Sequence, residues 1–412
     1  MTLKQFCKIF GITEMKNIPY AKTVYGNEEI KAVVKCLKES TQMGNYSRDF
    51  ECQIAELFSK KDCLYVNSGS SALYIGIEAF NFPKGSEVIT PVLTFGTTVG
   101  CLIKNNLVPA FVDVEPLSYC IDVTKIEEAI TEKTVAILAP NLLGNICDWP
   151  RIREIANNHN LKVIEDSADT LGATINQKST GYFSDMSITS FYGSHIINCA
   201  GNGGALALND DSAIEKAKLL RSWGRSSSLF DEKSELIENR FNVVLDGLDY
   251  DAKFVFETAG YNLEGSEIGA AFGLVQLGKL DEYIRIRQEN FLRQCQFFAG
   301  HSKYFYCPIE TPNVSTAWLA FPILIRKDAP FNRKELQIFL EKNNIQTRVC
   351  FTGNILRQPM MRDQKYKSVS GKYPNADEIM ERAFLLPVHH GMSESMFEKL
   401  HNKINKFIKD KE

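Results

Sequence analysis

The 412-residue sequence lacks the features that mark several large classes of protein. Its 47 lysines and arginines form no basic block, and its acidic residues form no tail, so a nucleic-acid partner is not expected. No apolar run approaches the roughly 20 residues that span a membrane, and residues 1–15 contain no secretory signal. We therefore expect a cytoplasmic protein that binds neither nucleic acid nor membrane.

The 11 cysteines also lack a pattern. They are scattered along the chain, with no Cys-x-x-Cys pair and no cluster of cysteine with histidine of the kind that binds zinc. Free thiols in a reducing compartment explain this distribution better than disulfide bonds do. No metal site is predicted.

The chain is long enough for two domains, and its composition is that of an ordinary globular protein, with 44% hydrophobic and 24% charged residues. Apolar strand patterns recur in its first part, separated by segments of helical length. The expected strands are 62–67, 87–90, 109–114, 135–139, 162–165, 186–190 and 204–208, and helices are expected at 27–40, 72–80 and 95–105. This alternation predicts an α/β domain with a mostly parallel sheet covered on both faces.

The second part of the chain predicts a smaller α+β domain. A long helical pattern runs from Gly265 toward Phe291 and would link the two domains. Short strands are expected at 317–325 and 346–350, and helices at 332–342, 375–384 and 394–408. We place the large domain at residues 1–280, including an N-terminal arm, and the small domain at residues 281–412. The polar segment 226–257 is expected to form a long loop or a hairpin.

Several candidate site residues follow the expected strands, where ligands bind in parallel sheets. The string Ser68-Gly69-Ser70-Ser71 opens a helix after a strand, and the N–H groups of a helix start bind phosphate well. A capped helix after a tight turn explains the same string.

The string Glu165-Asp166-Ser167-Ala168-Asp169 closes another strand. A buried carboxylate at this place could pair with a protonated pyridine nitrogen, although a helix cap would use the same residues. Phe95 ends a third strand and could stack on a ring, or it could belong to the core.

His195 follows Ser190-Phe191-Tyr192 and precedes the glycine cluster 201–204. Histidine moves protons near neutral pH, although a single histidine more often has a structural role. The neighbouring glycines and the other candidate strings favour a functional histidine here.

Three further strings mean little alone, since ordinary turn chemistry explains each. They are Trp223-Gly224-Arg225, Gly260-Tyr261-Asn262-Leu263, and Thr347-Arg348 followed by Gly353-Asn354 and Arg357-Gln358-Pro359. Arginine recognises planar anions such as diphosphate or carboxylate, so Arg348 and Arg357 are candidate substrate ligands.

Taken together and in order, these strings resemble the DegT/DnrJ/EryC1/StrS family of pyridoxal-phosphate sugar enzymes. The resemblance covers nearly the whole chain, from Ile18-Pro19-Tyr20 to Leu386-Pro387-Val388-His389, and is carried by 67–73, 163–166, 190–192 and 260–263. It implies an aspartate-aminotransferase-like fold (the type I PLP fold) and a homodimer with active sites at the interface.

The resemblance also implies residue roles. The implied cofactor, pyridoxal 5′-phosphate (PLP) or pyridoxamine 5′-phosphate (PMP), would be bound by Gly69, Ser70, Ser71, Phe95, Asp166, Asp169, Ser190 and, from the partner subunit, Asn262. In these roles Asp166 meets the pyridine nitrogen, Phe95 covers the ring, and Ser70, Ser71 and Ser190 hold the phosphate. The substrate would meet Trp223, Arg225, Arg348, Asn354 and Arg357.

His195 stands where most members of the family have the lysine that forms a Schiff base with the cofactor. Histidine cannot form that bond. A sub-branch with histidine comprises the 3-dehydratases of nucleotide-linked 4-keto-6-deoxyhexoses, in which the histidine acts as the acid/base while the C3 hydroxyl leaves. The resemblance therefore implies such a dehydratase, acting in 3-deoxysugar biosynthesis.

Some 3-dehydratases carry an iron–sulfur cluster on cysteines in the loop that corresponds to 226–257. A thiolate cluster needs about four cysteines, and this chain has none between Cys199 and Cys295. We therefore expect the other type, which takes its amine from L-glutamate.

Two alternatives remain open from the sequence. The chain could be a nucleotide-sugar aminotransferase that uses another lysine, with Lys178 the nearest upstream candidate. It could also be a non-catalytic relative that only binds a nucleotide sugar.

Overall fold

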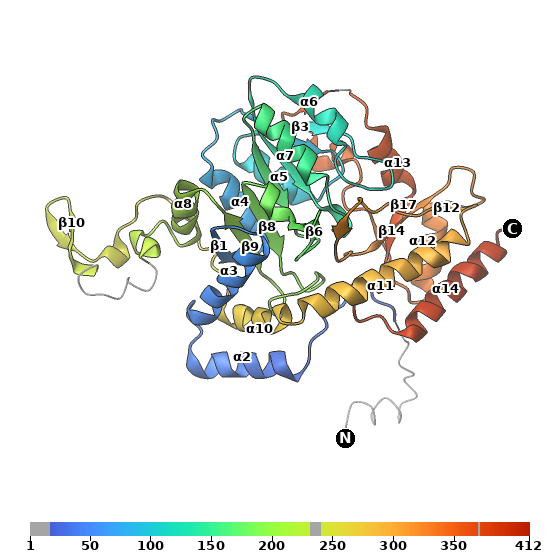
Figure 1. Ribbon diagram of the computed structural model, residues 1–412, viewed down its shortest axis with the longest axis horizontal. Coiled ribbons are helices and arrows are strands. Elements are labelled where there is room, and N and C mark those ends of the chain that lie inside the picture. Colours follow the sequence, from blue (N-terminus) through green and yellow to red (C-terminus); the bar gives the residue numbers. More distant parts are fainter. Residues whose placement is uncertain (1–16, 231–239, 370) are drawn as a thin grey trace.

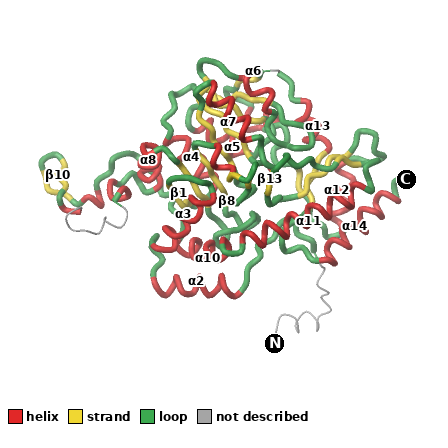
Figure 2. Tube along the Cα trace, in the orientation of Figure 1, coloured by secondary structure: helices red, strands yellow, loops and turns green. Residues whose placement is uncertain are grey.

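The computed structural model describes residues 17–230, 240–369 and 371–412, and its centre is an eight-stranded sheet (Figures 1 and 2). Residues 1–16 of the predicted arm and 231–239 of the predicted loop lie outside the described residues. In spatial order the strands are β1 (Asp62–Val66), β9 (Gly204–Leu208), β8 (Met186–Ser190), β5 (Lys162–Asp166), β4 (Thr134–Pro140), β2 (Glu87–Pro91), β3 (Val108–Val112) and β16 (Lys367–Ser368).

Pairing in this sheet is parallel except at β9, which runs antiparallel to both of its neighbours. The sheet is therefore mostly parallel, as predicted. The carboxyl ends of β4, β5 and β8 lie at one edge, which is where the candidate residues Asp166 and Ser190 stand.

Helices cover both faces of the sheet, which is why its strands are apolar throughout (Figure 2). They are α3 (Asn45–Leu57), α4 (Gly69–Ala79), α5 (Gly96–Lys104), α6 (Ile126–Ala129), α7 (Trp149–Asn158), α8 (Asp211–Arg221) and α10 (Glu267–Leu277), and α2 (Asn27–Glu39) packs against α10 rather than on the sheet. One core cluster joins Leu64 of β1 to Ile75 of α4 and Leu220 of α8. Another joins Ile137 of β4 to Trp149 of α7. Each such side chain stabilises the fold by about 1.5–3 kcal/mol when fully buried.

The C-terminal part forms a second layer of sheet and helix at the end of α11 (Leu280–Ala299) (Figure 1). Its four-stranded antiparallel sheet has the order β12 (Phe305–Tyr306), β14 (Phe321–Ile325), β17 (Ala383–Leu386) and β15 (Arg348–Val349). Its helices are α12 (Arg333–Lys342), α13 (Pro374–Arg382) and α14 (Glu394–Lys409). Phe291 of α11 stacks on Trp318, with ring centroids 4.1 Å apart, and this pair is part of the core beneath the small sheet.

Two small β elements complete the described chain. A three-stranded sheet has the order β13 (Val314–Ser315), β6 (Thr174–Ile175) and β7 (Lys178–Ser179). The hairpin β10 (Val243–Leu245) and β11 (Leu248–Tyr250) projects from the body of the molecule (Figure 1). Its turn, Asp246-Gly247, has positive φ at both residues, as two-residue hairpin turns require. The hairpin predicted within 226–257 is therefore confirmed.

The structure corrects two expectations about secondary structure. The single long helix predicted from Gly265 is two helices, because the chain breaks at Gly278-Lys279, where Lys279 forms ion pairs with Glu28 and Glu29 of α2. The helix predicted at 375–384 ends at Arg382, because β17 begins at Ala383 and pairs with both β14 and β15.

The N-terminal segment crosses to the C-terminal part of the chain. Ile18 forms a parallel bridge with Ile345, and the carbonyl of Pro19 lies 3.1 Å from Nε2 of His389. The edge strand β16 likewise joins the large sheet from the C-terminal part. The division into two domains at residue 280 remains a proposal. The contacts above connect residues before position 280 with residues after it.

No helix in the described ranges combines the length and apolarity needed to cross a membrane.

Candidate active site

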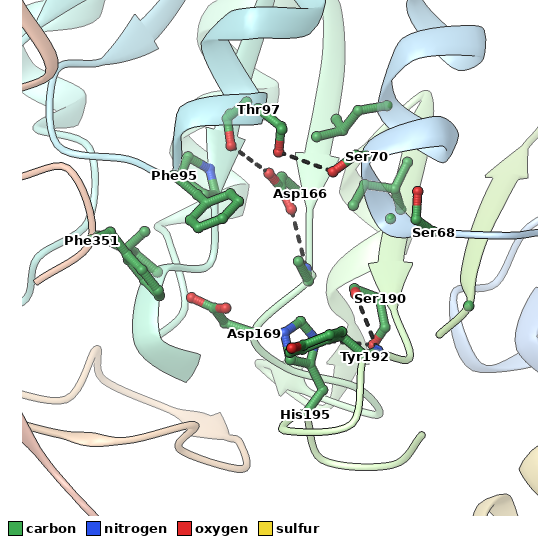
Figure 3. Close-up of a pocket in the computed structure, with 18 of the residues that line it drawn as sticks. Ser68, Ser70, Phe95, Thr97, Asp166, Asp169, Ser190, Tyr192, His195 and Phe351 are labelled. Carbon is green, nitrogen blue, oxygen red and sulfur yellow. Dashed lines mark hydrogen bonds between the residues drawn. The ribbon is translucent and has the colours of Figure 1, made fainter. Parts of the chain in front are cut away.

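A cavity of about 290 Å³ opens at the carboxyl ends of the central strands (Figure 3). Seven of the predicted site residues line it: Gly69, Ser70, Phe95, Asp166, Asp169, Ser190 and His195. They come from four separate segments of the chain, so the folded chain brings together residues up to 126 positions apart in sequence.

One wall of the cavity is the start of α4. The Ser68 hydroxyl accepts the N–H of Ser71 at 3.1 Å and so caps the helix. Ser70 Oγ lies at the cavity, 3.3 Å from Oγ1 of Thr97 (Figure 3). A helix start with hydroxyls beside it attracts a phosphate dianion, because its N–H groups point outward and the helix dipole is positive there.

Gly69 allows this helix start to touch the end of β8. A Cβ atom at Gly69 would lie 2.8 Å from Cβ of Ser190, closer than side chains approach. The segments that carry Ser70 and Ser190 therefore meet only because residue 69 has no side chain.

Replacing Gly69 with alanine should push α4 away from Ser190. We expect a loss of about 1–3 kcal/mol in the free energy of unfolding, as for other overpacked sites, together with weaker cofactor binding. Thermal unfolding and titration with PMP would measure both. Gly100→Ala in α5 is the matched control, because its Cβ would enter open space; it should stabilise the protein by about 0.5–1 kcal/mol. Equal effects of the two variants would contradict this account.

Asp166 ends β5 at the floor of the cavity. Its Oδ2 accepts the hydroxyl of Thr98 at 2.9 Å, and its Oδ1 accepts the N–H of Ala168 at 3.1 Å. Burial raises the pKa of this carboxyl, and the hydrogen bond from Thr98 opposes that rise. A buried carboxylate without a cation is costly, so the site favours a positively charged partner in the cavity.

Two phenylalanines form an aromatic wall. Phe95 is 53% exposed toward the cavity, and the ring of Phe351 meets it edge-on with centroids 5.7 Å apart (Figure 3). Phe351 has a φ of 44°, which is unusual for a bulky residue. Thr352 stabilises this turn, because its hydroxyl donates to the carbonyl of Thr94 at 2.6 Å.

His195 lies in a loop that folds back on β8. The N–H of Phe191 donates to the carbonyl of Gly203, and the N–H of Gly193 donates to the carbonyl of Gly201, each at 2.9 Å. The ring returns to the strand end, with Nδ1 3.1 Å from the carbonyl oxygen of Ser190. Because a carbonyl only accepts, we assign the proton of the neutral ring to Nδ1, which places the lone pair on Nε2; the backbone of Ala168 also interacts with the ring.

Burial lowers the pKa of His195 to about 4, and the hydrogen bond to Ser190 opposes this shift. The imidazole is therefore neutral at neutral pH. In Figure 3 its ring lies at the opposite end of the cavity from Thr97. The cavity thus has a carboxylate at its floor, hydroxyls and a helix start on one side, an aromatic face, and a neutral base. These groups fit a flat, phosphorylated pyridine ring such as that of PLP.

The cavity wall contains no lysine within the described ranges. Lys178, the alternative considered from the sequence, lies in β7 with its ammonium group 4.0 Å from the centre of the Tyr182 ring. It does not line the cavity, so it cannot tether a ligand there without a rearrangement.

The remaining predicted ligands do not line this cavity. The Ser71 hydroxyl donates to Oδ1 of Asn67 at 2.7 Å instead. Asn262 is exposed and bridges to Ser222. Trp223 and Arg225 line a separate hollow, with the guanidinium of Arg225 4.5 Å from the centre of the Trp223 ring.

The predicted ligands from the C-terminal part also lie outside the cavity lining, and two of them bind Asp377. Asn354 Nδ2 donates to Oδ1 of Asp377 at 2.8 Å, and Arg357 Nε donates to the same oxygen at 2.7 Å. Arg348 is exposed, with its guanidinium 5.4 Å from the centre of the Tyr20 ring.

The cavity residues to which the sequence assigned no role include Thr97, Thr98, Tyr192 and Phe351. Thr98 could have been predicted from the sequence. It lies in the first turn of the helix that follows Phe95, and that turn faces the carboxyl ends of the central strands. Phe351 has no comparable signal, because nothing in its neighbours predicts a left-handed backbone.

Comparison with protein families finds one match over most of the chain. A model of the DegT/DnrJ/EryC1/StrS aminotransferase family matches residues 24–405. The lipopolysaccharide biosynthesis protein RfbH of Salmonella typhimurium strain LT2 is 33% identical over 402 residues, covering 95% of this chain and 92% of that protein. The dTDP-4-dehydro-2,6-dideoxy-D-glucose 3-dehydratase of Saccharopolyspora spinosa is also 33% identical, covering 93% and 84% respectively.

Solved structures of similar fold include a 3-dehydratase of a nucleotide-linked sugar. A variant of GDP-4-keto-6-deoxymannose-3-dehydratase with bound GDP-perosamine superposes with a TM-score of 0.83 at 28% identity, covering 94% of this chain and all of that one. The same enzyme with a trapped PLP-glutamate geminal diamine gives a TM-score of 0.82 at 28% identity, covering 93% and 100%.

Proposed function

The chain belongs to the DegT/DnrJ/EryC1/StrS aminotransferase family, and on that premise we propose that it is a 3-dehydratase of a nucleotide-linked 4-keto-6-deoxyhexose. It is an enzyme with the α/β fold of the PLP-dependent aminotransferases, so the predicted fold class is confirmed. Its cofactor is PLP or PMP. The product would be a 3-deoxy keto sugar.

The observation that carries the proposal is the neutral imidazole of His195 in a cofactor cavity where the described wall has no lysine. An aminotransferase of this fold needs a lysine to bind the cofactor covalently. A histidine at this place can accept and return a proton but cannot form that bond. The site is therefore suited to a freely bound amine cofactor.

Five residues of the cavity have roles in this proposal. When bound, PMP supplies an amine that condenses with a ketone and a ring that withdraws electrons. Asp166 would keep the pyridine nitrogen protonated, Ser70 and Ser190 would bind the phosphate, and Phe95 would cover the ring. His195 Nε2 would accept a proton and donate it to the C3 hydroxyl, which would leave as water.

The names of the relatives support the class of substrate. Two of them are described as 3-dehydratases of nucleotide-linked deoxysugars, and one of these was solved with a GDP-sugar. We propose that Arg348, Asn354 and Arg357 meet the nucleotide-sugar side of the cavity. The glutamate adduct of the solved relative supports L-glutamate as the amine donor.

We also propose a homodimer in which Trp223, Arg225 and Asn262 serve the partner's cavity. These three residues do not line the cavity of their own subunit. The absence of cysteine between Cys199 and Cys295 supports a reaction without an iron–sulfur cluster.

Product analysis tests the proposal directly. The protein would be incubated with GDP-, CDP- and dTDP-linked 4-keto-6-deoxyhexoses, each with PMP and L-glutamate. We expect one sugar to lose its C3 oxygen while ammonia and 2-oxoglutarate are released, as mass spectrometry and enzymatic assays would show. A product that gains nitrogen at C4 and keeps its C3 hydroxyl would identify an aminotransferase instead. Binding of all three without any product would favour the non-catalytic alternative.

A further inference from the structure

The N-terminal segment 18–24, which we call the strap, crosses from the C-terminal part of the chain to the loop that follows β8. At its first end, the N–H of Ile18 donates to the carbonyl of Asn344, and the N–H of Gln346 donates to the carbonyl of Ile18, each at 2.9 Å. The N–H of Tyr20 donates to Oε1 of Gln346 at 3.0 Å. These hydrogen bonds fix the strap to the residues that precede β15.

At its other end, the strap holds the loop after β8 just before His195. The hydroxyl of Thr23 donates to the carbonyl of Gly193 at 2.5 Å, and the N–H of Gly193 donates to the carbonyl of Gly201 across the loop at 2.9 Å. Gly193 also packs closely against the strap, because a Cβ atom there would lie 3.2 Å from Oγ1 of Thr23. The peptide group that Thr23 binds is therefore close to the imidazole along the chain.

The strap also reaches the loop on the other side of His195. Nε2 of Gln276 donates to the carbonyl of Val24 at 3.1 Å, and Nδ2 of Asn198 donates to Oε1 of the same Gln276 side chain at 3.3 Å. Gln276 and Asn198 are buried, so water does not compete for these bonds. The loop is thus connected to the strap both before and after His195.

The direction of the imidazole depends on this loop. The N–H of His195 donates to the carbonyl of Tyr192 at 2.9 Å, and Nδ1 of the ring lies 3.1 Å from the carbonyl oxygen of Ser190. Gly193 lies between these contacts in the chain, so a shift of its peptide group changes the aim of the ring. A displacement of about 1 Å in a catalytic group can lower the rate about 10²-fold.

The loop closes on itself without the strap. The N–H of Phe191 donates to the carbonyl of Gly203 at 2.9 Å, and the N–H of Cys199 donates to the carbonyl of Phe191 at 3.2 Å. A single neutral hydrogen bond contributes a small part of the stability of a protein. Loss of the Thr23 hydroxyl should therefore leave the protein folded and change the orientation of the loop.

We propose that Thr23 is a positioning residue that aims His195 into the cavity, so that the strap sets the direction of the imidazole from the C-terminal part of the chain. The inference rests on the proposed function, because His195 carries a proton in that reaction. Thr23 does not line the cavity, and it acts through the backbone of Gly193.

The first test compares turnover among variants of residue 23. Thr23→Val keeps the shape of the side chain and removes its hydroxyl. With the sugar identified by product analysis, the turnover rate should fall about tenfold, while KM and the dissociation constant of PMP stay within about twofold, because the change falls on a group that acts in the transition state. Thr23→Ser keeps the donor and should retain the wild-type rate within about twofold. In the His195→Asn protein, Thr23→Val should have no further effect, since the hydroxyl acts through the imidazole.

Thr311→Val is the matched control for stability. The hydroxyl of Thr311 also donates to a backbone carbonyl that is distant in sequence, that of Ile146, at 2.5 Å. Neither residue lines the cavity. Thr311→Val should lower the thermal stability about as much as Thr23→Val does and should leave turnover unchanged.

A second readout needs neither sugar nor cofactor. NMR of protein with ¹⁵N-labelled histidine reports which ring nitrogen carries the proton, and His195→Asn identifies the signal of His195. The wild type should have the proton on Nδ1, as the contact with Ser190 indicates. Thr23→Val should shift that signal, whereas Thr23→Ser and Thr311→Val should leave it in place.

The outcomes separate this inference from the proposed function. Unchanged turnover together with an unchanged His195 signal in Thr23→Val would overturn the role of Thr23 and leave the proposed function standing. An equal loss of turnover with and without the imidazole would also overturn that role, because the hydroxyl would then act elsewhere. If the wild type dehydrated no sugar, the proposed function would be wrong, and the NMR comparison would still decide whether Thr23 orients the ring.

Discussion

Replacing His195 with lysine is expected to convert the protein from one that binds its cofactor freely to one that binds it covalently. The lysine amine would reach the space where the imidazole now lies, because residue 195 faces the cavity between Tyr192 and Asp169. Addition of PLP should then produce an absorption band near the blue edge of the visible range, and borohydride should fix the label on residue 195. Dehydration of the sugar should fall by about 10²–10⁴-fold, the usual contribution of a positioned general base.

His195→Asn is the matched control for this change. It removes the base without introducing an amine, so it should lose turnover to a similar extent and show no covalent band. Peptide mapping after borohydride treatment of the wild-type protein completes the test. A labelled lysine in the wild type, or normal dehydration by the lysine variant, would disprove the role assigned to His195.

Replacing Asp166 with asparagine is expected to leave the protein folded but nearly inactive. The amide cannot hold a proton on the pyridine nitrogen, so the ring loses its capacity to withdraw electrons. We expect the turnover rate to fall about 10²–10³-fold, as when one preorganised electrostatic group is removed from an active site. Cofactor affinity should fall about 10- to 100-fold, because a hydrogen bond to a charged group is lost.

The neighbouring Glu165 gives a stringent control. It is also fully buried, but it points to the opposite face of β5, where the hydroxyls of Ser167 and Ser187 donate to it at 2.6 Å. Glu165→Gln should lower the thermal stability and leave cofactor affinity nearly unchanged. If the two substitutions weakened cofactor binding equally, the effect would reflect general damage to the strand, and the specific role of Asp166 would be refuted.

The sequence predicted the sheet and seven of the residues that line the cavity because both depend on local patterns. Apolar strands followed by Ser68, Asp166 and Ser190 place those residues at one edge as soon as the sheet is parallel. The direction of β9 was not predictable in this way. Its residues Gly204–Leu208 form a short apolar run. Such a run gives no signal for whether the strand pairs parallel or antiparallel.

The contacts that depend on tertiary packing could not be predicted from the sequence. Ser71 resembles a phosphate ligand, yet its hydroxyl turns to Asn67, because the third residue of a capped helix faces the preceding strand end. Phe351 reaches Phe95 because the hydroxyl of the adjacent Thr352 binds the carbonyl of Thr94, which joins two segments far apart in sequence. Trp223, Arg225 and Asn262 do not line the cavity, and their short strings in the sequence did not predict that position.

Two pairings, of Ile18 with Ile345 and of β3 with β16, join segments that are far apart in sequence. Folding of the protein during synthesis therefore cannot finish until the later segment of each pair has been made. A ribosome releases residue 18 and β3 long before residue 345 and β16, so the nascent chain must wait with an unpaired sheet edge and a loose N-terminal segment. Unpaired edges invite aggregation, and contacts between distant parts of a chain slow folding. Phe351, which closes the aromatic wall, emerges in the same late stretch, so the pocket acquires its final shape only near the end of translation.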